Sequence, residues 1–486
     1  MRIDLMQVTF RQIWDLPRLS ALPVGLALLL IAVLLGLLPV QTSLPLAAVT
    51  AAVIMALRHP WLVWVALAAL IPLAASLRVA GVSPADLLVA AGLLLWAAHA
   101  IARRQWIAAP QIPLWPLALY LAALLFASVV ATNLGEAASE VIKWAQFAVL
   151  LWVVPLATPS RVAPWLIAAL LLAAVAQSVL GLYQFIYRIG PEWFTIQDRF
   201  MRASGVFRQP NPYAGYLGLS LPIALALSLW SLGRWRQWHR QPPDAALAAA
   251  LVIASTLIAA GLVASWSRGG WLGAAVGVSV VVVLHSRGTA LVASLIALGG
   301  GLSASLGALN PAWVPATIRD RLTDLPSYFG AGDILNQPVT DENFAVLERL
   351  AHWVAATRMW EGSLWLGVGP GNYNQAYAAV ALPLWPQPLG HAHNIYLNVL
   401  AESGIVGFVA FVLLWLVLAG WLIRLVRRLP PHNWQRAVAV GSLGVLAHLA
   451  VHSLFDNLFV QGIYLHLAFW PAVLAIAAPR ESDDPA

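Results

Sequence analysis

Cysteine is absent from this chain, and charged residues are scarce. None of the 486 residues is a cysteine, which excludes disulfides, thiolate catalysis and cysteine-bound zinc or iron, and leaves the redox compartment open. Charged residues make up 10% of the chain and hydrophobic residues 61%, with a mean hydropathy of +0.80. This apolar surface exceeds what one soluble core can bury, so we predict a polytopic membrane protein.

The apolar stretches show little of the period-two alternation of a membrane β-barrel, so the expected spans are helices. Lipid offers no hydrogen-bond partners to the backbone, whereas a helix pairs its own backbone groups. A helix needs about 20 apolar residues to cross a bilayer. Fourteen runs fit: 20–40, 44–57, 60–80, 84–102, 113–131, 141–157, 164–186, 212–232, 245–265, 269–284, 289–308, 404–423, 437–456 and 461–478. Because 44–57 and 141–157 are short, we predict an all-α fold with 12–14 transmembrane helices.

Arginines in the short loops predict the orientation. These are Arg58, Arg103, Arg104, Arg161, Arg234, Arg236, Arg240, Arg287, Arg424, Arg427, Arg428 and Arg436. Fourteen spans with a cytoplasmic N-terminus put all of them, and the C-terminal tail, inside. Since they are spread over loops, the net charge of +7 does not indicate a nucleic-acid partner. Loop 187–211, the turn 265–270 and segment 309–403 then share the extracytoplasmic side.

Segment 309–403 is too long for a passive connection and contains several prolines. We predict a large extracytoplasmic loop with short helices, one of them amphipathic over Phe344–Trp360 and lying along the membrane surface. The glycine-rich stretch Gly367–Tyr373 follows. It lacks the spacing of a phosphate-binding loop, so we interpret it as a turn.

A polar stretch, Gly390-His391-Ala392-His393-Asn394, stands directly before another apolar run. Histidine exchanges a proton near neutral pH, which makes it the first candidate for a catalytic base. Side chains two residues apart diverge both in a strand and in a helix, so we expect only one of the two histidines to face the reaction centre.

Two arginines on the same side are candidates for binding an anion. Prolines close to Arg208 restrain its backbone, and a fixed guanidinium suits a diphosphate. The alternative is an interfacial anchor. Arg268 sits between two apolar runs, where an unpaired charge is costly, so we expect an anionic partner, either a ligand or the carboxylate of Glu402 or Asp456. Arg199 and Arg202 are expected to be solvated.

His448, His452 and Asp456 recur every four residues and would share one face of a helix. This spacing fits a divalent metal, but a polar stripe facing the bundle interior is the favoured interpretation, so we expect no metal. Ser267 has no GxSxG surroundings, which argues against hydrolase chemistry.

Taken together, these motifs resemble the O-antigen ligase and polymerase superfamily of bacterial envelope proteins. The resemblance rests on Gly205–Gly215, Ser267-Arg268-Gly269-Gly270, Gly367–Tyr373, and His393-Asn394 followed by Gly404 and Gly407. It covers residues 200–460. We accordingly divide the chain into N-terminal transmembrane helices (1–199), a catalytic membrane region with the external loop (200–460), and a last helix with a cytoplasmic tail (461–486).

The resemblance implies a GT-C-like enzyme of the bacterial inner membrane with an extracytoplasmic active site. It would transfer a glycan from an undecaprenyl diphosphate carrier to a lipid-anchored acceptor, without a cofactor or metal. By motif, the functional residues are Arg208, Arg268, His393 and Asp456, with His393 as the base and the arginines on the diphosphate. His391 and Asn394 are expected to shape the substrate site.

Two alternatives stay open at this point. A polymerase would extend the glycan on its own carrier with the same donor and similar groups. A transporter or flippase would move the substrate intact, and would place its charges at mid-bilayer between related half-chains. In this chain the charges gather at one face, so we favour the ligase.

Overall fold

The computed structural model describes residues 40–74, 77, 82–104, 111–196, 199–237, 242–305, 338–340 and 343–477. Within them the fold is helical, apart from one two-stranded hairpin, and it confirms the predicted polytopic helical membrane protein. Eight helices are long and apolar enough to cross a bilayer, and five shorter apolar helices accompany them. The predicted span 20–40 lies almost entirely outside the described residues, as does much of loop 309–403.

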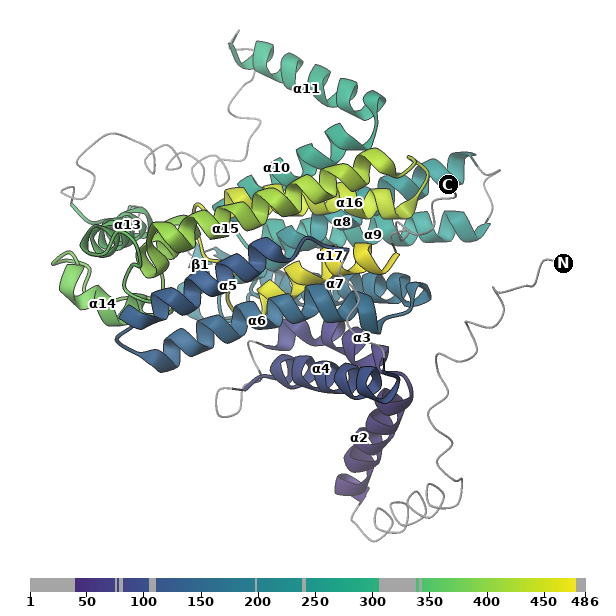
Figure 1. Cartoon of the computed structure of the whole chain (residues 1–486). Coiled ribbons are helices and arrows are strands. Elements are labelled where there is room, and N and C mark those ends of the chain that lie inside the picture. Colours follow the sequence, from purple (N-terminus) through teal and green to yellow (C-terminus); the bar gives the residue numbers. More distant parts are fainter. Residues whose placement is uncertain are drawn as a thin grey trace.

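Most helices run side by side in one bundle (Figure 1). The first half comprises α2 (Val40–Arg58), α3 (Trp61–Leu70), η1 (Ile71–Ala74), α4 (Pro84–Ala102), α5 (Trp115–Ala127), η2 (Ser128–Val130), α6 (Leu134–Ala157), η3 (Ser160–Val162) and α7 (Ala163–Tyr187). After α7 come η4 (Glu192–Phe194) and the antiparallel strands β1 (Thr195–Ile196) and β2 (Phe200–Met201).

The second half contains α8 (Pro210–Gln237), α9 (Pro242–Ala264), α10 (Arg268–His285), α11 (Arg287–Ser305), α13 (Phe344–Gly362), α14 (Tyr373–Val380), α15 (Ile395–Arg428), α16 (Trp434–His452) and α17 (Ile463–Ala477). Helices α13 and α14 cluster at one end of the bundle, and α11 projects away from it (Figure 1). The predicted helix over Phe344–Trp360 is therefore confirmed as α13. It packs against α15.

Helix α16 forms the centre of the packing, in close contact with α8 and α10. Small residues allow this approach. A Cβ on Gly444 would lie 2.7 Å from the carbonyl oxygen of Gly277 and 2.8 Å from Pro222, so a larger side chain has no room there. Such small-residue contacts are the usual way for membrane helices to pack tightly.

Three helix boundaries differ from the apolar runs, because side chains that cap or interrupt a helix are polar. Helix α6 starts at Leu134, not near 141, since Asn133 accepts hydrogen bonds from the N–H groups of Gly135 and Glu136. It is a full-length candidate span. Helix α15 starts at Ile395, nine residues before its apolar run. Helix α16 ends at His452, so Asp456 follows the helix and does not share a helical face with His448.

Candidate functional site

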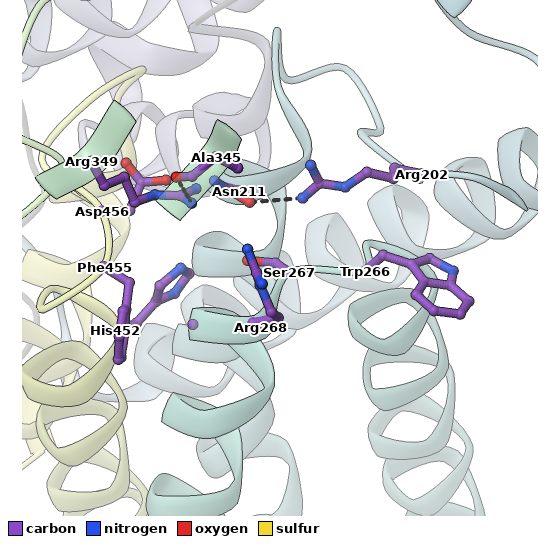
Figure 2. Close-up of a pocket in the computed structure, with 11 residues that line it drawn as sticks. Arg202, Asn211, Trp266, Ser267, Arg268, Ala345, Arg349, His452, Phe455 and Asp456 are labelled. Atoms are coloured by element: carbon purple, nitrogen blue, oxygen red, sulfur yellow. Dashed lines mark hydrogen bonds between the residues drawn. The ribbon is translucent and has the colours of Figure 1, made fainter. Parts of the chain in front are cut away.

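A small pocket of about 60 Å³ opens where loops at one end of the bundle meet α8, α10, α13 and α16 (Figure 2). Its lining comes from segments far apart in the sequence and is rich in charge. The lining residues are Arg202, Asn211, Trp266, Ser267, Arg268, Gly269, Ala345, Arg349, His452, Phe455 and Asp456. Three guanidinium groups therefore share one small space.

We call Arg202, Arg268 and Arg349 the cationic side of the site. Arg268 is the first residue of α10 and only 8% exposed. Arg202 is fixed in two directions, because its Nε donates to the carbonyl of Ser265 (2.9 Å) and its Nη2 to Oδ1 of Asn211 (2.8 Å). Arg349, on α13, donates to the carbonyl of Ala345 (3.0 Å). The three side chains converge in Figure 2 from different elements.

Two helix N-termini add to this positive field. Helix α10 begins at Arg268 and is capped by the hydroxyl of Ser267, and α8 begins at Pro210, next to the lining residue Asn211. The N-terminus of a helix carries roughly half a positive charge. The pocket is thus built to hold an anion.

The sequence proposed Arg208 as a diphosphate-binding residue, but it is Arg202, not Arg208, that lines the pocket. The side chain of Arg208 is exposed and does not line the pocket. Arg202 was expected to be solvated, and it is instead partly buried and hydrogen-bonded. Arg349 was visible in the sequence only as one charge on an amphipathic helix. Only Arg268 was assigned correctly to the pocket lining.

We call His391, His393 and Asp456 the imidazole side of the site. Oδ1 of Asp456 lies 3.4 Å from Nδ1 of His393 and 3.9 Å from Nε2 of His391. We expected the two side chains to diverge, but both rings lie near Asp456, because the backbone is neither extended nor helical here. Gly390 (φ 92°) and His393 (φ 52°) are both left-handed, which turns both rings toward one carboxylate.

A hydrogen bond assigns the proton of His391, and the ionic contact with Asp456 orients the ring of His393. Nδ1 of His391 accepts the backbone N–H of His393 (3.0 Å), so a neutral His391 carries its proton on Nε2, facing Asp456. In His393, Nδ1 faces Asp456. A proton on that nitrogen leaves Nε2 as the basic atom.

Asp456 is an ionised carboxylate and His391 a neutral imidazole. Burial alone would raise the pKa of Asp456, but contact with His393 and the charges nearby, Arg349 among them, lower it below its usual range. Burial, aided by His393, lowers the pKa of His391 to about 3. Because Asp456 also lines the pocket, it connects the imidazole side to the cationic side.

A third imidazole, His352 on α13, was not singled out from the sequence. It is 1% exposed, and its ring lies edge-on to that of His393 with centroids 5.8 Å apart. The hydroxyl of Tyr373 donates to the carbonyl of His352 (3.1 Å) and accepts from its Nδ1 (3.0 Å). Burial lowers the pKa of His352 to about 4, so this ring is neutral at pH 7.

The glycine-rich stretch Gly367–Tyr373 forms turns, as predicted, and fits against a break in α15. Gly404 interrupts that helix with a φ of 61°, which leaves backbone groups for other partners. The carbonyl of Ala401 accepts the N–H of Val368 (2.9 Å), and the N–H of Ile405 donates to the carbonyl of Leu364 (2.9 Å). The loop thereby takes the place of a missing helical turn.

Glu402 and Asn394 are engaged in holding this scaffold. The carboxylate of Glu402 accepts the N–H groups of Gly371 (3.0 Å) and Tyr373 (3.3 Å), so of the two carboxylates proposed for Arg268 only Asp456 lines its pocket. Asn394, which the motif suggested as a substrate contact, caps α15 by accepting the N–H of Tyr396 (3.0 Å).

The structure groups metal-type ligands differently from the sequence. His448 and His452 form a buried pair, with 3.3 Å between Nε2 of His448 and Nδ1 of His452, and His452 reaches the pocket. In the described residues the donor atoms that lie within 4.8 Å of one another are those of His391, His393 and Asp456. This is the same trio that forms the imidazole side.

Residues 250–412 match the family model described as O-antigen ligase. The match supports the resemblance to that superfamily and contains Arg268, Arg349 and His393 of the site, while Arg202 and Asp456 lie outside it. The chain is thus similar to membrane proteins of the glycan ligase and polymerase type, which act on lipid-linked glycans. No curated protein matches the chain.

Proposed function

We propose that this protein transfers a glycan from an undecaprenyl diphosphate carrier to a lipid-anchored acceptor at the outer face of the bacterial inner membrane. One observation carries the proposal: Asp456 lines the cationic pocket and also lies 3.4 Å from Nδ1 of His393. A leaving-group site and a base are thereby joined through one carboxylate.

The cationic side suits a diphosphate leaving group. Guanidinium groups bind phosphate oxygens with two parallel hydrogen bonds, and helix N-termini favour anions. Arg202, Arg268 and Arg349 would stabilise the charge that builds up as the bond from sugar to phosphate breaks. Fixed positive groups aimed at developing charge are among the largest contributions to catalysis.

His393 would act as the general base. Its Nε2 accepts the proton of the acceptor hydroxyl while that oxygen attacks the anomeric carbon, and the bonding electrons of the departing group leave with the lipid diphosphate. Asp456 stabilises the imidazolium formed in this step, as carboxylates paired with histidine do. Attack opposite the leaving group inverts the anomeric carbon, and the proton then passes from His393 to water.

Reconstitution tests the proposal directly. Purified protein in vesicles, supplied with an undecaprenyl diphosphate oligosaccharide and candidate acceptors, is expected to form a new glycosidic bond, detected as a mass shift. His393→Ala should lower turnover by about 10²- to 10⁴-fold, the usual contribution of a positioned base. His391→Gln is the matched control and should lose far less.

Three results would contradict the proposal. Equal losses in the His393 and His391 variants would remove the special role of Nε2 in His393. Movement of the intact donor across the vesicle membrane without a new glycosidic bond would identify a transporter. Extension of the glycan on its own carrier, with no transfer to a separate acceptor, would identify the polymerase.

A further inference from the structure

A stack of aromatic rings leads away from the cationic pocket. Trp266, in the turn between α9 and α10, lines the pocket and stacks on Phe200 of β2, with centroids 5.0 Å apart and planes at 30°. Phe200 in turn stacks on Phe185 of α7, with centroids 6.2 Å apart and planes at 5°. Figure 2 shows the indole of Trp266 pointing away from Arg349 and Asp456.

The stack becomes more exposed with distance from the pocket. Trp266 is 6% exposed, Phe200 and Phe185 are half-buried, and Ile186, next to Phe185 on α7, is 66% exposed. Helix α7 belongs to a candidate membrane span that ends at Tyr187. The rings therefore connect the cationic pocket with the apolar surface of a membrane helix near its end.

One turn positions both an arginine and the first ring of the stack. Trp266 has a φ of 53°, a conformation that side chains other than glycine rarely adopt. The preceding carbonyl, that of Ser265, accepts the hydrogen bond from Nε of Arg202 (2.9 Å). The backbone that anchors a guanidinium on the pocket thus also directs the indole toward Phe200.

We infer that Phe185, Phe200 and Trp266 form the subsite for the isoprenoid segment next to the diphosphate of the donor. This inference rests on the proposed function. A lipid attached directly to a diphosphate in the cationic pocket needs an apolar path to the membrane. Trp266 lines the pocket, and Phe200 and Phe185 continue the stack from it to α7. Flat aromatic rings contact branched, unsaturated chains through dispersion and burial of apolar surface.

Binding of two sugar-free probes tests the subsite independently of glycosyl transfer. Affinities of a three-isoprene diphosphate and of inorganic diphosphate are measured by calorimetry on the detergent-purified full chain. Phe200→Ala is expected to weaken the three-isoprene diphosphate about tenfold and to leave inorganic diphosphate within twofold. Trp193→Ala is the control, because Trp193 belongs to the same loop but is 82% exposed, and it should change neither affinity.

Each other outcome has a defined meaning. Equal weakening of both probes would show that Phe200 only supports the pocket, and an unchanged preference for the isoprenoid probe would show that the rings do not contact it. Either result overturns the inference. Phe200→Leu, which keeps an apolar side chain, should restore part of the preference if the variant is folded. Persistence of the preference in a protein that transfers no glycan would contradict the proposed function alone.

Discussion

The two sides of the site are built in different ways. The cationic side takes its position mainly from helices: Arg268 starts α10, Arg349 lies on α13, and Arg202 is tied to residues beside α8 and α9. The imidazole side depends on a loop that contains left-handed residues, Gly390 and His393 among them. Helices mainly position the guanidinium groups, while a left-handed backbone conformation positions the imidazoles.

The largest effect that we expect on the cationic side is from Arg268. Arg268→Ala should lower turnover by about 10²-fold or more, since loss of one fixed group facing transition-state charge typically has this effect. Arg268→Lys should recover part of it, because a point charge keeps the attraction but loses the two-pronged contact. Both are measured as initial rates of glycan transfer in vesicles.

Arg208→Ala is the control, because it removes the same charge from a residue outside the pocket. It is exposed and outside the pocket, so turnover should stay within about threefold of the unmodified protein, as expected for a surface contact. A loss at Arg208 as large as that at Arg268 would restore the arrangement that the sequence alone suggested.

The next effect concerns the break in α15, against which the segment Leu364–Val368 packs. In Gly404→Ala the new Cβ would lie 2.2 Å from the backbone carbon of Trp365, at a φ of 61°. We expect a loss of about 2 kcal/mol or more in the free energy of unfolding, from strain and overlap together. Thermal unfolding in detergent measures it.

Gly420→Ala provides the contrast within the same helix. A Cβ at Gly420 meets nothing within 4 Å, so this change should be neutral or stabilise the helix by up to about 1 kcal/mol. Equal destabilisation by both substitutions would mean that α15 tolerates alanine poorly in general, and that the break has no special role.

The sequence predicted the helices well because the apolar runs that form them are local features of the chain. Apolar runs of membrane length predict spans directly, and the errors occurred where polar side chains begin or end a helix, as at Asn133 and His452. It also brought Arg268, His393 and Asp456 to one site. These residues stand out because polar groups are rare beside apolar spans.

The sequence missed Arg202 and His352 and misjudged the direction of His391, for reasons that are not local. Arg202 resembles any loop arginine until the fold brings Asn211 and Ser265 to it. His391 was misjudged because its direction depends on left-handed residues that side-chain type does not reveal, apart from Gly390. In the sequence, His352 is one polar residue of a predicted amphipathic helix. Its contacts with Tyr373 and His393, which relate it to the site, are visible only in the structure.

Acid should affect the imidazole side before the cationic side. His391 and His352, with pKa values lowered to about 3 and about 4, stay neutral in the folded protein below pH 6.5, whereas the unfolded chain takes up protons there. Stability is therefore lost as pH falls from about 6.5 to 5, by at most about 1.4 kcal/mol per pH unit for each histidine. Arginines stay charged throughout this range.

The difference between variants isolates this effect. The thermal midpoint of the unmodified protein should fall more steeply between pH 7 and pH 5 than that of His352→Leu, which has one fewer histidine to protonate on unfolding. The comparison uses slopes, so a constant change in stability from the substitution does not matter. Parallel slopes would contradict a neutral, buried His352.

The smallest effect that we expect is from metal removal, and it separates two uses of the same three residues. The donor atoms of His391, His393 and Asp456 lie within 4.8 Å of one another, close enough for a divalent ion. A bound ion would coordinate a nitrogen of His393 and would lie between that nitrogen and Asp456. In the proposed mechanism, the three guanidinium groups and two helix N-termini of the cationic side would stabilise the leaving diphosphate. We therefore expect chelation with EDTA to leave the rate of glycan transfer within about twofold, and added zinc to inhibit transfer by competing for His393.

A different result would show that the imidazole side is a metal centre. In that case chelation would abolish transfer, one equivalent of metal would restore it, and His391→Gln would weaken this restoration.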